Sequence, residues 1–84
     1  MLVDTIKSKL SSKLNIIHLD IIDETYKHAG HPQSSGGHFK LKIVSDDFKG
    51  KSLIERHRMI YGILAEMIKN EIHALSIDAK TSEE

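Results

Sequence analysis

The sequence predicts an α+β protein in which helices cover one face of a small sheet. Two segments, 2–14 and 53–68, carry apolar residues at helical spacing, and three others, near 17–22, 39–44 and 73–79, alternate apolar and polar residues as strands do. Elements in this order favour a two-layer sandwich around a single core. At 84 residues the chain has the length of one domain, which we expect to cover residues 1–84.

The first segment is predicted to be an amphipathic helix over residues 2–14, because leucine or isoleucine recurs at every fourth position. Two strands follow, and we expect them to pair antiparallel. The second strand carries lysines on its outer face. The buried face of the first strand is expected to hold Ile17, Leu19 and Ile21, and that of the second strand Phe39, Leu41 and Ile43.

Between these strands, from about Thr25 to Gly37, the chain is too rich in glycine and proline for regular structure. Three of its six histidines lie in or beside this segment: His28, His31 and His38. A connection of this length is uncommon in a small domain and usually has a function. Imidazole binds borderline metals, so a zinc site is one alternative, although this spacing matches no standard structural zinc pattern.

The second helical segment begins with Ser52 and Glu55 at the spacing of a capping box. Its apolar stripe is expected to start at Leu53 and to continue through Ile60, Leu64 and Met67. His57 lies in phase with this stripe, and a partly buried histidine bonded to a backbone carbonyl is the favoured interpretation. Asn70 is predicted to end the helix with left-handed backbone.

The last predicted strand places His73 in phase with the buried Leu75 and Ile77, at the end of the sheet where one ring nitrogen stays accessible. As a lone histidine it would more often be structural than a ligand. Residues 80–84 form a polar tail or the opening of a short helix.

Composition excludes several classes of function. Twelve basic and twelve acidic residues cancel, which removes the global charge signature of a nucleic-acid binder. The absence of cysteine excludes disulfides and a thiolate metal site made by this chain alone. The sequence has neither a glycine-flanked nucleophilic serine nor a clear pair of carboxylates, so nothing in it indicates hydrolytic catalysis. We find no signal-peptide or membrane-spanning pattern, and we therefore expect a cytoplasmic protein with no membrane role.

Several motifs of the chain resemble those of the BolA family. Phe48-Lys49-Gly50, Arg56-His57-Arg58 and His73-Ala74-Leu75 follow one another in the family's order and spacing, and Gly37-His38-Phe39 agrees in the first half. The resemblance covers nearly the whole chain and is closest to the branch with a histidine in the loop. It implies the class II KH-like fold, with the order αββααβ, a mixed three-stranded sheet, often a final short helix, and a second helical segment that is divided in two.

The resemblance also implies a function. Family members partner monothiol glutaredoxins and share a 2Fe-2S cluster with them, for which the glutaredoxin supplies a cysteine and a bound glutathione. Carried over to this chain, His73 is the strand ligand and His28 the loop ligand, with His31 as the alternative. Histidine ligation of one iron resembles the Rieske arrangement, so a chain without cysteine can form half of such a site. The leading hypothesis is a non-enzymatic iron–sulfur adaptor for cluster delivery or iron and redox sensing, monomeric or weakly dimeric when free.

A second hypothesis is a nucleic-acid-binding regulator of transcription or the stress response, because some relatives are described as transcription regulators and the implied fold is KH-like. The zero net charge and the lack of a Gly-x-x-Gly clamp count against it, so we expect at most weak DNA binding. A third hypothesis is a plain protein–protein module without metal. The second hypothesis requires a local basic face, for which the candidates are Lys40, Lys42, Lys49, Lys51, Arg56 and Arg58, with Lys49, Lys51, Arg56 and Arg58 as the proposed contacts.

Overall fold

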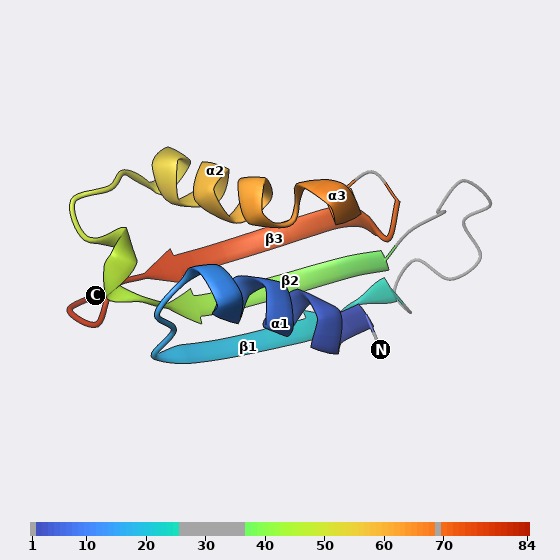
Figure 1. Ribbon diagram of the computed structural model, residues 1–84, viewed down its shortest axis with the longest axis horizontal. Coiled ribbons are helices and arrows are strands. Elements are labelled where there is room, and N and C mark those ends of the chain that lie inside the picture. Colours follow the sequence, from blue (N-terminus) through green and yellow to red (C-terminus); the bar gives the residue numbers. More distant parts are fainter. Residues whose placement is uncertain (1, 26–36, 69) are drawn as a thin grey trace.

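The computed structural model describes residues 2–25, 37–68 and 70–84. The loop histidines His28 and His31 lie outside these ranges. Within them the elements follow the order helix, two strands, two helices, strand, as the sequence and the resemblance predict (Figure 1). The bounds are α1 Leu2–Lys13, β1 His18–Asp23, β2 Gly37–Val44, the 3-10 turn η2 Asp46–Phe48, α2 Leu53–Ile63, α3 Ala65–Ile68 and β3 Ile72–Lys80.

The three strands form one mixed sheet in the order β1-β2-β3. The predicted antiparallel pairing of β1 with β2 is confirmed, and β3 runs parallel to β2. Because β2 and β3 point in the same direction, both begin at the end of the sheet where β1 finishes (Figure 1). The start of β2, the start of β3 and the end of β1 therefore meet at one end of the sheet.

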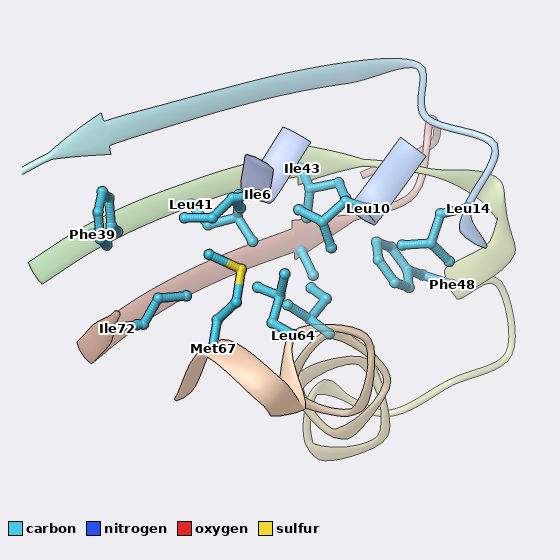
Figure 2. Close-up of a cluster of buried hydrophobic side chains, with 12 residues drawn as sticks. Ile6, Leu10, Leu14, Phe39, Leu41, Ile43, Phe48, Leu64, Met67 and Ile72 are labelled. Atoms are coloured by element: carbon cyan, nitrogen blue, oxygen red, sulfur yellow. The ribbon is translucent and has the colours of Figure 1, made fainter. Parts of the chain in front are cut away.

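The core fills the space between the sheet and the helices, as Figure 2 shows. Residues four apart on α1 share one face of the helix, and alternate residues of β2 share one face of the strand. These two faces pack against each other and against the buried side of α2 and α3. The main contributors are Ile6, Leu10, Phe39, Leu41, Ile43, Ile60, Leu64 and Met67. We call the opposite side of the sheet the open face, because Asp20, Lys42 and Asp78 are exposed there and no described element covers them.

The start of α2 confirms the capping box. The Ser52 Oγ accepts from the Glu55 N–H at 3.2 Å, and the Ser52 N–H donates to the Glu55 carboxylate at 2.8 Å. The helical stretch is divided after Ile63, as the family resemblance implies. Asn70 is not left-handed, since no described non-glycine residue has a positive φ; its side-chain amide instead donates to the Glu66 carbonyl at 3.3 Å.

Two expectations about apolar residues are wrong. Ile17 is 59% exposed, because β1 begins only at His18. Leu53 is 65% exposed, because Arg56 takes the buried position in the first turn of α2. Phe48, at the end of the 3-10 turn η2, is fully buried. Residues 81–84 form a turn, in which the Glu84 N–H donates to the Thr81 carbonyl at 3.2 Å.

Candidate functional site

A β-bulge determines where His73 points. Gly37 pairs with Ile72, but the next residue of β2, His38, pairs with Ala74, so His73 is an extra residue in β3. Ile72 packs into the core at 1% exposure, whereas His73 is exposed. The exposure of His73 agrees with its predicted place at the end of the sheet, but His73 does not continue the buried face of Leu75, because the bulge interrupts the alternation.

His38 lies beside His73. Its neighbour Phe39 is buried in the core, so His38 is directed toward the open face. The two imidazole ring centroids are 5.0 Å apart, and the ring planes are tilted by 50°. This separation is within the range of contacting aromatic rings. In the sequence His38 lies beside the other loop histidines, and the parallel pairing of β2 with β3 brings it to His73.

The backbone of His38 is held on both sides by the residues that follow β1. Its N–H donates to the Thr25 Oγ1 at 3.0 Å, and its carbonyl accepts from the Glu24 N–H at 2.7 Å. The Thr25 N–H donates in turn to the Asp23 carboxylate at 2.9 Å. Hydrogen bonds from the Thr25 side chain and backbone lower the pKa of Asp23. This end of the sheet is therefore tied together across β1 and β2.

Gly37 lies close to the Phe39 ring and to the turn before β3. A Cβ atom at this position would overlap the Phe39 ring and would lie 3.3 Å from the Glu71 carbonyl oxygen. The Gly37 N–H donates to that same carbonyl at 2.8 Å. Only glycine lets β2 begin directly against the turn before β3, which places the next residue of β2 beside His73.

A hollow of about 410 Å³ opens beside His38. Its lining comes from all three strands or the residues next to them: Glu24, His38, Phe39, Ala74, Leu75 and Ser76. Within the described ranges no group of three or more His, Asp or Glu side chains is arranged to hold a metal ion. The zinc alternative, which needs His28 and His31, lies outside those ranges.

Arg56 has a structural position. Its side chain is buried, and its guanidinium donates to the Lys51 carbonyl at 3.0 Å and to the Ala79 carbonyl at 3.0 Å. The same group forms a two-point ion pair with Glu84. The hydrogen bonds of this pair raise the pKa of Arg56. Arg56, one of the four proposed nucleic-acid contacts, therefore forms its hydrogen bonds inside the protein.

The remaining basic candidates do not share one face. Lys49 pairs with the Glu83 carboxylate at 3.2 Å, and Arg58 is exposed on α2. The Lys42 side chain is on the open face, on the other side of the sheet from α2, and its neighbours in register are Asp20 and Asp78. Acidic residues therefore offset much of the local positive charge.

The fold and this site define a small KH-like α+β domain with an exposed histidine at one end of a mixed sheet. Residues 10–84 match the family model described as BolA-like protein. The chain belongs to the BolA-like family. Among solved structures, the BolA domain of SufE1 from Arabidopsis thaliana superposes with a TM-score of 0.85 at 48% identity, over 95% of this chain and 91% of that one.

Curated relatives carry names of two kinds. The chain is 46% identical over 86 residues to SufE-like protein 1, chloroplastic/mitochondrial, of Arabidopsis thaliana; the match covers 94% of this chain but only 23% of that protein. It is 39% identical over 84 residues to the DNA-binding transcriptional regulator BolA of Escherichia coli, over 100% of this chain and 79% of the relative. No helix in the described ranges is long and apolar enough to cross a membrane.

Proposed function

We propose that this chain is a non-enzymatic adaptor that shares a 2Fe-2S cluster with a monothiol glutaredoxin. The observation that carries the proposal is the exposed imidazole of His73, which the bulge turns out of the sheet at the end where all three strands meet. A ligand to a cluster held between two proteins must lie at the surface of each. The relatives named BolA-like or transcriptional regulator do not suggest an enzyme.

The chemistry of the donor set fits such a cluster. Neutral imidazole is a good ligand for borderline metals, and histidine replaces cysteine on one iron in Rieske centres. We propose His28 as the second ligand of this chain, with His31 as the alternative. His28 follows Thr25 by three residues, and Thr25 is bonded to the backbone of His38. The short chain segment between Thr25 and His28 supports this choice.

In this proposal the glutaredoxin supplies a cysteine and a bound glutathione thiol. The cluster, when bound, would supply an iron–sulfur unit for transfer or a redox-sensitive signal. The part played by the chain's own residues is to present the imidazole of His73 at the end of the sheet, to supply His28 as the second ligand, and to bind the partner beside them.

The proposal is tested by adding this protein to a cluster-loaded monothiol glutaredoxin under anaerobic conditions. We expect a mixed complex on gel filtration, with visible circular dichroism that differs from that of the glutaredoxin alone. A glutaredoxin spectrum that does not change when this protein is added contradicts the proposal. A mixed complex that forms equally well without iron and sulfide, with no new bands, would favour the metal-free module.

A second candidate function is nucleic-acid binding. The name of the Escherichia coli relative, which matches along the whole chain, supports it. Arg58 is exposed and Lys51 is half-buried near the start of α2, so both remain available as phosphate contacts. Because Arg56 is engaged with Glu84, the basic face is smaller than the sequence suggests. We therefore rank this function second.

A further inference from the structure

We infer that His38 is a positioning residue: its ring packs against the imidazole of His73 and holds it in one orientation. The consequence for ligand binding rests on the proposed function, but the positioning itself is a property of the protein alone. The inference follows from the ring contact, from the bulge and from the way the backbone of His38 is fixed.

His73 needs such support because of its place in the sheet. As the extra residue of a bulge it has no partner in register on β2, and its side chain is exposed. An exposed side chain without a packed neighbour samples several rotamers, and ordering it on binding has an entropic cost. The ring of His38, centred 5.0 Å away, gives His73 a surface to pack against. Because of this contact, the His73 side chain has fewer rotamers to lose when a ligand binds.

His38 is itself held in place, which a positioning residue requires. Its backbone N–H and carbonyl are bonded to Thr25 and Glu24. Its side chain is half-buried, and its neighbours along β2 are the close-packed Gly37 and the buried Phe39. The ring of His38 is therefore held in place and lines the hollow, while His73 is more exposed to solvent.

Two substitutions distinguish a His38 that packs against His73 from a His38 that binds a metal. His38→Phe keeps a flat ring of similar size but removes both ring nitrogens, whereas His38→Ala removes the ring altogether. His18→Ala is the matched control, because His18 is an exposed histidine at the opposite end of β1 and contacts Asp20 at 3.0 Å. Backbone amide spectra of each variant show whether the fold is retained.

The first measurement uses the protein without a partner, at one fixed pH. Side-chain couplings and ring relaxation of isotope-labelled His73 report its rotamers. We expect one dominant rotamer in the wild type, in His38→Phe and in His18→Ala, and averaging over several rotamers in His38→Ala. Unchanged His73 couplings in a folded His38→Ala variant would overturn the inference.

The second measurement uses the complex with a monothiol glutaredoxin. We expect His38→Phe to retain the visible circular dichroism of the mixed cluster, and His38→Ala to lose the cluster on the order of 10-fold faster, as for other groups that orient a metal ligand. Loss of all bands in His38→Phe, as in a ligand deletion, would overturn the inference and make His38 a ligand. If the wild type forms no mixed cluster, the proposed function fails, while the His73 couplings still test the positioning.

Discussion

Arg56 and Glu84 form a two-point ion pair between α2 and the turn that follows β3. The Arg56 Nη1 lies 2.6 Å from the Glu84 Oε1, and its Nη2 lies 3.1 Å from the Oε2. Two further donors of the guanidinium reach the carbonyls of Lys51 and Ala79. One buried side chain thus joins three segments, and planar two-point contacts of this kind are specific to arginine.

Substitution of Arg56 should destabilise the fold. Arg56→Ala leaves the Ala79 carbonyl without its buried donor and the Glu84 carboxylate without its partner, so we expect a clear loss in free energy of unfolding. Arg56→Lys should lose less, because it keeps the charge but not the fork. Arg58→Ala, at an exposed position on the same helix, is the control. Urea denaturation curves that are equal for Arg56→Ala and Arg58→Ala would contradict this assignment.

The same pair predicts a pH dependence. The hydrogen bond from Arg56 is the largest cause that lowers the pKa of Glu84 from 4.5 to about 2. Because the pKa in the folded state is below its unfolded value, the pair stabilises the fold above pH 4.5, and this contribution is lost as the pH falls from 4.5 toward 2. Glu84→Gln should make the fall in stability across that window shallower.

The curve of the Glu84→Gln variant should not become flat, since hydrogen bonds with Ser82 and Ser52 also lower the pKa values of Asp46 and Glu55. Urea midpoints measured at several pH values for both proteins give the comparison. Parallel wild-type and variant curves below pH 4.5 would show that the ion pair does not carry this pH dependence.

Phe48 should contribute far more to stability than its place in a short turn suggests. Its side chain is fully buried, and Phe48→Ala should cost about 3–5 kcal/mol of unfolding free energy. Leu53→Ala is the control, because Leu53 is 65% exposed and its loss should change stability by about 0.5 kcal/mol or less. Chemical denaturation of both variants checks the order. A Leu53→Ala loss as large as that of Phe48→Ala would mean that the first turn of α2 packs differently.

DNA binding by the isolated protein should be weak and sensitive to salt. The exposed Arg58 and the half-buried Lys51 are the available contacts, and interactions beyond the Debye length of about 8 Å are screened at physiological salt. A titration of duplex DNA at several salt concentrations gives the number of phosphate contacts from its slope. We expect a shallow slope that Arg58→Ala reduces further. Nanomolar, sequence-dependent affinity that Arg58→Ala abolishes would put the regulator function first.

Local patterns account for what the sequence predicts correctly. The helix at residues 2–13, the alternation of β2 and the Ser52–Glu55 box depend on neighbours within a few residues, so periodicity and spacing reveal them. The order of elements follows from the same periodicity along the chain, and the family resemblance adds the division of the second helical segment.

Non-local geometry accounts for the errors. The burial of Arg56 depends on Glu84, which is 28 positions away in the sequence. The burial of Phe48 could not be predicted from periodicity, because a single apolar residue has no repeating pattern. The outward direction of His73 depends on a register shift between β2 and β3, which the β3 sequence does not encode by itself. For the same reason the contact of His73 with His38 could not be predicted from spacing.

The ligand assignment is tested most directly by the visible circular dichroism of the mixed complex with a monothiol glutaredoxin, recorded for His73→Ala beside wild type and His18→Ala. We predict that His73→Ala loses the bands of the mixed cluster while its amide spectrum stays folded, that His18→Ala keeps them, and that His28→Ala weakens them more than His31→Ala does. A His73→Ala complex with the wild-type spectrum would contradict the assignment of His73 as a cluster ligand.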